Sequence, residues 1–241
     1  IDKITDPSQL EIAMKLFTYD IYNILVTQIY DELDMYVEES FINGGDLVFD
    51  QRVKFTDPHR SVEVTTRILD KVLEAFLDNF CPPVIVHQCF SQLVYYISAS
   101  LFNRVISTPS YCTPRVGLQI KMSVSHLISW LHHRGKDLPV LEGSVSHLNF
   151  VVELSNVLTL ATNESVFQEE YLAATFPSLN IAQLRKVIEL YSPDKYAPEP
   201  IPVQVKRFIN GACQRDPSVR SLPLDLEPVL PLGSISAPGE S

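Results

Sequence analysis

Histidine and cysteine are the side chains in this sequence whose chemistry would allow a metal site or a nucleophile. His132 and His133 are adjacent, so on a helix their side chains point about 100° apart and do not converge on one metal ion. Cys89 and His87 are two residues apart, a spacing at which helical side chains do not face each other. A nucleophilic thiolate needs a base within hydrogen-bonding reach. The sequence therefore predicts no metal ligand and no catalytic residue.

The sequence is also poor in the glycine that phosphate-binding loops need. It has 8 Gly and 17 Pro among 241 residues, and it holds neither G-x-x-x-x-G-K-[ST] nor G-x-G-x-x-G. The hydrolase motif G-x-S-x-G and the zinc motif H-E-x-x-H are absent from it as well. We therefore expect a protein that is not an enzyme and that uses no cofactor.

Charge separates the classes of partner. The chain has 29 acidic and 19 basic residues, a net charge of -10, which disfavours binding to nucleic acid because phosphate contacts need clustered Lys and Arg. Two local groups of charge are candidate protein-binding residues, and the alternative is that they form ordinary solvated helix faces. The candidates are the acidic Asp31, Asp34 and Glu38 and the basic Arg185, Lys186, Lys206 and Arg207.

The cellular compartment follows from cysteine usage and hydropathy. The 4 Cys residues show no C-x-x-C spacing, which is typical of reduced thiols in a cytosolic protein. The longest uncharged stretch, residues 79–103, contains prolines, glutamines and a histidine, so we expect no integral membrane contact. The first residues do not resemble a signal peptide, and the chain does not begin with Met, so we expect a piece of a longer protein.

Apolar periodicity positions these residues on helices. Apolar residues recur every three or four positions from Leu10 to Val37, which is the pattern of an amphipathic helix. Similar patterns, bounded by proline or glycine, predict an all-α multi-helix bundle of about seven to eight helices. The best alternating stretch, residues 47–55, is too short to be a confident strand, and we interpret residues 46–60 as a loop. The predicted helices cover residues 7–42, 62–80, 83–106, 117–134, 148–158, 164–174, 180–191 and 203–213.

Two regions are expected: a helical domain over residues 1–215 and a proline-rich tail over residues 216–241. The tail has no sustained period, so we expect it to be extended or disordered unless something binds it. Its many leucines leave open a second possibility, a strap that packs along the bundle.

The predicted core comes from the apolar positions of these helices. We expect Trp130 to be a core anchor whose truncation to Ala would cost ~3–5 kcal/mol. The core positions predicted in this way are Phe90, Leu93, Ile97, Phe102, Ile120, Leu127, Trp130, Leu184 and Leu190.

Several segments resemble the dilute (DIL) domain family. They are Phe-Ser-Gln-Leu-Val-Tyr-Tyr-Ile-Ser-Ala-Ser-Leu-Phe-Asn at 90–103, Gly-Leu-Gln-Ile-Lys at 117–121 and Val-Ser-His-Leu-Ile-Ser-Trp-Leu at 124–131. Residues 179–193 resemble the next recurrent block of the family. The family includes the globular cargo-binding tails of class V myosins and the junctional scaffolds afadin and Radil.

The resemblance implies a function that composition alone does not. It implies a cytoplasmic interaction module, at cytoskeleton, vesicle or cell-junction sites, that binds cargo receptors, small GTPases or their effectors as a class V myosin tail does. The alternative is the DIL domain of an afadin or Radil type scaffold in Ras signalling and cell adhesion. The resemblance leaves the partner, its contact residues and the oligomeric state open.

Overall fold

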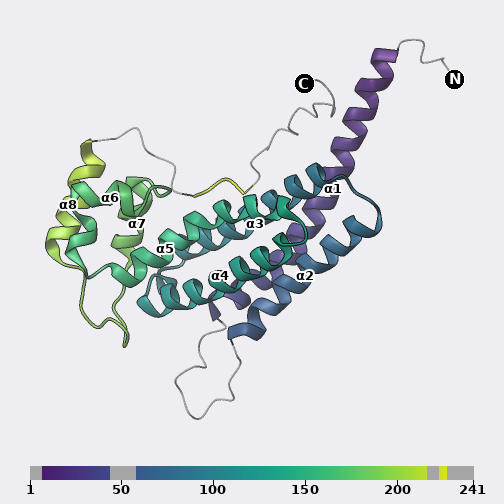
Figure 1. The fold of residues 1–241 in the computed structure, drawn as a ribbon. Helices are drawn as coiled ribbons and strands as arrows, with labels where there is room; N and C mark the ends of the chain where they lie inside the picture. The colour runs from purple at the N-terminus through teal and green to yellow at the C-terminus, as the bar shows by residue number, and fades with distance from the viewer. Residues whose placement is uncertain (1–6, 44–57, 216–222, 227–241) are drawn as a thin grey trace.

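The computed structural model describes residues 7–43, 58–215 and 223–226, and over these ranges the fold is all-α, as predicted (Figure 1). Within those ranges there are α-helices and short 3-10 helices and no strand. The predicted loop at residues 46–60 falls mostly outside the described residues. The α-helices are α1 (Pro7–Phe41), α2 (Pro58–Asp78), α3 (Pro83–Ser107), α4 (Pro114–Gly135), α5 (Asn149–Leu160), α6 (Glu169–Thr175), α7 (Ile181–Leu190) and α8 (Val203–Arg215), with 3-10 helices η2 (Pro109–Tyr111), η3 (Pro139–Leu148) and η4 (Glu164–Phe167).

Proline and side-chain caps set several helix starts. Pro83 and Pro114 occupy the first turns of α3 and α4, where the missing backbone N–H costs no hydrogen bond. The Thr113 side chain accepts a hydrogen bond from the Val116 N–H at the start of α4. Asn180 and Gln183 form a reciprocal capping box at the start of α7. These local signals explain why the predicted starts of α3 and α7 lie close to the observed ones.

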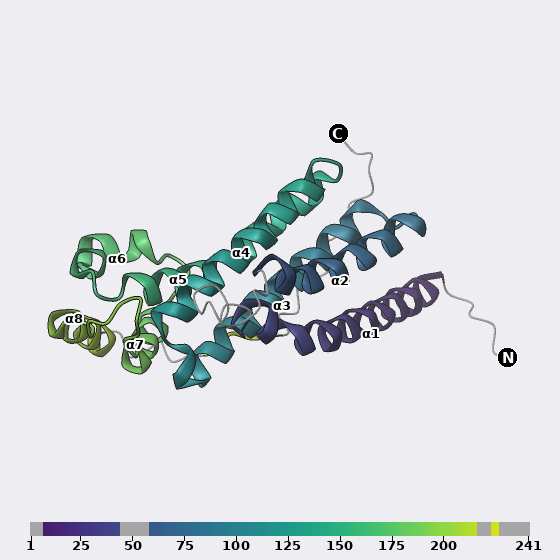
Figure 2. The ribbon, with the colours of Figure 1, turned by 90° about the horizontal axis from the view of Figure 1, so that it is seen from below.

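The long helices α1 to α4 form the larger part of the bundle, and α6, α7 and α8 gather at its other end (Figures 1 and 2). α1 packs against α2 and α3, α4 packs against α5, and α7 packs against α8. The N-terminal end of α1 stands clear of the other labelled helices in Figure 1. The four long helices therefore share one core, while one end of α1 lies outside it.

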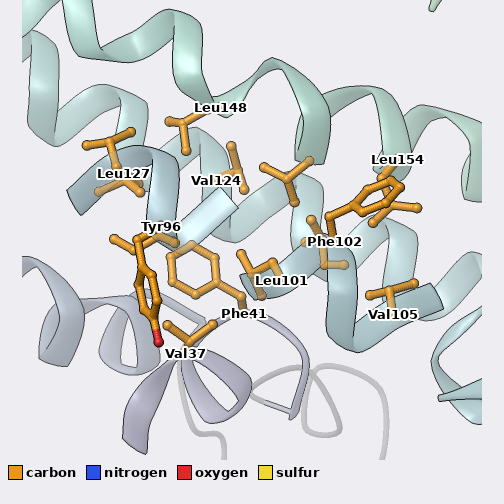
Figure 3. Packing of buried hydrophobic residues seen from close by; sticks show 14 of the residues in the cluster. Val37, Phe41, Tyr96, Leu101, Phe102, Val105, Val124, Leu127, Leu148 and Leu154 are labelled. Carbon is orange, nitrogen blue, oxygen red and sulfur yellow. The ribbon is translucent and has the colours of Figure 1, made fainter. Parts of the chain in front are cut away.

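Side chains of α1, α3, α4 and α5 meet in that core (Figure 3). Phe41 of α1 lies beside Leu101 of α3, and Phe102 of α3 lies beside Leu154 of α5. All four side chains are fully buried, and so is Val37. Burying a Phe or Leu side chain stabilises a fold by about 1.5–3 kcal/mol. Of the predicted core positions, those that are fully or almost fully buried are Phe90, Leu93, Ile97, Phe102, Ile120, Leu127 and Leu184.

Trp130 and Leu190 differ from this prediction, because both are only partly buried at the edge of the core. The Trp130 ring stacks on Phe90 with 6.3 Å between centroids, and its indole N–H donates a 3.1 Å hydrogen bond to Asp70 Oδ1 on α2. A buried indole N–H needs an acceptor, and this carboxylate lies near the surface. The polar end of the ring therefore keeps Trp130 at the boundary between α2 and α4.

Two short stretches also depart from the predicted helices. The predicted helix over 164–174 is two elements, because Gln168 has an extended backbone with φ -76° and ψ 149° between η4 and α6. The 3-10 helix η3 was not predicted, since its period of about three residues leaves no amphipathic stripe of the α-helical kind. η3 packs against both α3 and α4, so this irregular stretch covers part of the core.

Part of the C-terminal tail lies against the bundle. Residues 223–226 lie against α3, where Asn103 binds Leu224. Leu224 and Leu226 are partly buried against the core. The remaining tail residues, 216–222 and 227–241, lie outside the described residues. These four described residues therefore pack along the bundle as a strap, which was the second possibility for the tail.

Candidate functional site

An apolar concavity lies between α1 and α2, and we call it the α1–α2 groove. It encloses about 580 Å³ and ends at the turn between α2 and α3. Its walls are apolar side chains from both helices, with three polar side chains among them. The groove is lined by Leu25, Ile29, Ile68, Val72, Ala75, Phe76, Phe80, Cys81 and Pro82, together with Glu32, Lys71 and Asn79.

The α1 wall of this groove is part of a longer apolar stripe. Phe17, Ile21, Leu25 and Ile29 are spaced four residues apart, so they lie on one side of the helix. Their exposed fractions fall along the helix from 67% and 50% to 38% and 6%. The stripe therefore continues from the groove onto the exposed N-terminal half of α1.

Phe80 lies in the turn between α2 and α3, where the groove ends, and has an unusual conformation. It has φ 53°, the single positive φ of a non-glycine residue among the described residues, and 93% of it is exposed. Its N–H donates to the Leu77 carbonyl and the next N–H, of Cys81, donates to the Phe76 carbonyl, which is the Schellman arrangement. Glycine is the usual residue at this position, because a Cβ costs about 1–2 kcal/mol there. A large apolar side chain is thus held in water on a strained backbone.

The side chains that line the groove are suited to binding. Burial raises the pKa of the Cys81 thiol, so the one nucleophilic side chain in its wall is held in the neutral form. No group of three or more His, Cys, Asp or Glu side chains able to hold a metal ion occurs in the described part of the chain. Apolar walls with a few polar side chains suit the burial of apolar groups of a partner.

The other residues considered for chemistry have structural roles. Cys89 is fully buried, and burial raises its pKa to about 12, which keeps the thiol protonated at neutral pH. His87 Nδ1 lies 2.6 Å from the Val140 carbonyl oxygen and so ties α3 to η3. All four cysteines are free thiols.

The acidic candidates on α1 lie differently from what the sequence suggested. Arg104 of α3 binds Asp34 Oδ1 at 2.7 Å and Glu38 Oε2 at 3.0 Å, and the Tyr111 hydroxyl donates to Glu38. We call these four residues the Arg104 cluster. Two of the three predicted partner-binding acids are therefore occupied by contacts within the chain, while Asp31 is exposed. The sequence could not reveal this, because Arg104 lies 70 residues from Asp34.

The Arg104 cluster favours ionised carboxylates. Burial alone would raise the pKa of Asp34, but hydrogen bonds and charge from Arg104, with help from Tyr96 and Ser100, lower it below its usual value. The Tyr111 hydrogen bond is the largest cause that lowers the pKa of Glu38. The cluster therefore joins α1 to α3 most strongly when both acids are charged.

The basic candidates lie on the two helices that pack at the other end of the bundle. Arg185 of α7 pairs with Glu189 one turn on, at 2.6 Å, and its guanidinium also lies 3.9 Å from Cys213 Sγ of α8. Lys186 is partly buried, and Lys206 and Arg207 are exposed on α8. α7 and α8 thus bring the basic residues to one end of the molecule, although Arg185 already has an acidic neighbour.

One segment of the chain matches a known protein family. Residues 88–195, which run from α3 past α7, match the family described as DIL domain. The match covers somewhat less than half of the chain. The resemblance seen in the sequence is thereby confirmed.

The similar proteins include myosins, and the similar solved structures include a myosin cargo-binding domain. The chain is 28% identical over 173 residues to unconventional myosin-Vb of Mus musculus, covering 71% of this chain and 9% of the relative. The yeast myosin 5 cargo-binding domain has the same fold, with a TM-score of 0.73 and 19% identity over 91% of this chain and 53% of that one. A structure of Myo2-GTD in complex with Mmr1 matches with a TM-score of 0.74 and 19% identity, covering 91% of this chain and 52% of that one.

The chain therefore spans about a tenth of the length of the curated relative and about half of the solved domains. The lining of the α1–α2 groove runs from Leu25 to Pro82 and so lies wholly before the segment that matches the DIL domain. No helix within the described ranges combines the length and the apolar composition that a bilayer span requires.

Sequence reasoning missed the groove. The stripe of α1 was correctly read as apolar, but an apolar stripe does not show which of its turns another helix covers. The signal that was present is Phe80, a large apolar residue directly before Cys81, Pro82 and Pro83, where the chain must turn.

Proposed function

We propose that this protein is a non-enzymatic interaction module that binds the apolar side chains of a protein partner in the α1–α2 groove, as part of a cargo-binding tail like those of class V myosins. Phe80 carries the proposal, because it combines a strained backbone with almost complete exposure of a large apolar ring. Backbone strain persists where the surrounding structure supports it and is often found at functional sites. A partner that buries the ring would offset both costs.

The shape of the groove favours a helix as the bound segment. Its α1 wall repeats apolar side chains every four residues, a spacing that complements apolar residues one turn apart on a second helix. Glu32 and Lys71 are the charged side chains of the lining and would set the register of the bound helix. Related folds bind proteins, as the structure of Myo2-GTD in complex with Mmr1 illustrates. We expect the partner to be a cargo receptor, an adaptor, or a small GTPase or its effector, on vesicles or at the cytoskeleton.

The experiment that tests this function uses Phe80→Gly. The 241-residue chain is used to capture partners from a cell extract, each captured protein is purified, and its affinity is measured by calorimetry for the natural chain and for the variant. Removing the ring should weaken binding at least about tenfold, as expected for an aromatic hot spot. Glycine suits the backbone at this position, so the variant should remain folded.

The matched control is Val203→Ser on α8, which removes another exposed apolar side chain far from the groove lining. It should change the affinity less than about twofold. An unchanged affinity for Phe80→Gly, or an equal loss in both variants, would contradict the proposed use of the groove. Failure to capture any protein at micromolar concentrations of the chain would contradict the proposed function itself.

A further inference from the structure

The side chain of Asn103 on α3 forms hydrogen bonds with the backbone of residues 223–226. Asn103 Nδ2 donates a 2.8 Å hydrogen bond to the Leu224 carbonyl, and the Leu224 N–H donates a 2.7 Å hydrogen bond to Asn103 Oδ1. The amide of Asn103 thus satisfies both main-chain groups of one residue. Any extended segment that presents a free N–H and a carbonyl at this point could make the same pair of bonds.

Partly buried and exposed side chains alternate along residues 224–226. Leu224 and Leu226 are partly buried against the core, and Asp225 between them is exposed. Alternation with a period of two is the pattern of an extended segment lying on a surface. Binding of an extended peptide commonly uses main-chain hydrogen bonds for affinity and every second side chain for specificity.

Tyr95 lies on α3 eight residues before Asn103. Both residues are partly buried. Burial, and after it the charge of Asp225, raise the pKa of Tyr95, so this ring responds to the acid of the bound segment. The ring of His147 from η3 packs edge-on against Tyr95 with 6.1 Å between centroids. We call Tyr95, Asn103 and the surface between them the Asn103 site.

The described part of the segment in this site is short. It is four residues long, and Asn103 makes two hydrogen bonds to its Leu224. The connection to the end of α8 runs through residues 216–222, so the segment is tethered and benefits from a high local concentration. A longer segment of another protein could compete by adding contacts on either side.

We propose that the Asn103 site is a second binding site, for an extended segment of a protein partner with two aliphatic side chains two residues apart and an acid between them, and that residues 223–226 occupy it as an internal competitor. The site shares no residue with the α1–α2 groove. It is therefore independent of the proposed function of that groove, and either one can fail alone.

The test measures binding of a labelled peptide to the whole 241-residue chain. The probe is a fluorescein-labelled peptide of residues 220–230, and the receptor carries Leu224→Ser and Leu226→Ser to weaken the internal segment. The apparent affinity for a partly occupied site falls with the fraction of open receptor. We expect the probe to bind this double variant about tenfold more tightly than it binds the natural chain.

A second substitution identifies the site. Asn103→Ala in the double variant should weaken peptide binding at least about tenfold, since two partly buried hydrogen bonds are lost. Asn210→Ala on α8 makes the same change at an exposed helical position and should leave binding unchanged. No binding to the double variant, or binding that Asn103→Ala leaves unchanged, would overturn the proposal.

Hydrogen exchange of the natural chain provides a readout that needs no variant. Unlabelled peptide should displace the internal segment and speed exchange of the Leu224 amide, which Asn103 protects. Unchanged exchange at saturating peptide would overturn internal competition. Dimers that form without peptide and carry the same protection would also overturn it, because the occupant would then be a second copy of the chain.

Discussion

The two halves of α1 carry the same apolar stripe in different surroundings. In the C-terminal half, Leu33, Val37 and Phe41 are fully buried against the other long helices, whereas in the N-terminal half Phe17 and Ile21 are 67% and 50% exposed. The buried half also carries the acids of the Arg104 cluster, which join it to α3. One half of the helix thus serves the fold, and the other presents apolar surface for binding. The free energy of unfolding of variants, and its dependence on pH, distinguish these two roles.

The largest expected effect is on the buried half. Phe41→Ala removes a fully buried ring, so the free energy of unfolding should fall by about 3–5 kcal/mol. Phe17→Ala makes the same change on the same helix at a position where the ring is exposed. It should alter the free energy of unfolding by less than about 0.5 kcal/mol. Urea unfolding followed by circular dichroism measures both. Similar losses for the two variants would show that the N-terminal half is packed in solution.

The same contrast shows what the sequence can and cannot predict. The stripe of α1, the proline at the start of α3 and the capping box of α7 are local patterns, and the structure contains each of them. Which turns of α1 are covered depends on helices far along the chain, and so does the pairing of Asp34 with Arg104. Local pattern therefore predicts elements and their apolar faces, while exposure and partner choice depend on tertiary contacts.

The candidate site illustrates the same limit. Its α1 wall was visible as a stripe, but the sequence predicts the composition of a helix face and not the gap beside it. The positive φ of Phe80 lies in the turn that precedes two consecutive prolines, Pro82 and Pro83. The acids chosen from the sequence were the most prominent charges on α1, and charge was a poor guide because Arg104 neutralises two of them.

The next effect is on the polar side of the buried half. Arg104→Ala leaves Asp34 and Glu38 without their cation and should lower the free energy of unfolding by about 1–2 kcal/mol, after allowing for screening by solvent. Arg67→Ala breaks an exposed pair with Glu63 one turn away and should cost about 0.3–0.5 kcal/mol. Chemical denaturation at low and high salt measures both. If Arg104→Ala costs no more than Arg67→Ala, the cluster does not hold α1 to α3.

The Arg104 cluster also predicts a pH dependence. Asp34 and Glu38 have lowered pKa values in the folded protein, against about 3.9 and 4.3 for unfolded Asp and Glu. Their contribution to stability is therefore complete above the unfolded pKa values and is lost as pH falls through the folded ones. The difference in unfolding free energy between the natural chain and Arg104→Ala should be constant from about pH 7 to 5 and shrink below about pH 4. A difference that persists undiminished at about pH 3 would assign it to packing of the arginine side chain instead.

The smallest effect should have the opposite sign, and it separates binding from folding at the groove. Phe80→Gly relieves a positive φ at the cost of a more flexible unfolded chain, so the free energy of unfolding should rise by about 0.5 kcal/mol. Leu77→Gly, three residues earlier in α2 and also exposed, has no strain to relieve and should lose about 0.8–1 kcal/mol. Thermal and urea unfolding of both variants give the comparison. A loss of stability in Phe80→Gly would mean that the ring supports the fold, and its exposure would then no longer argue for a partner.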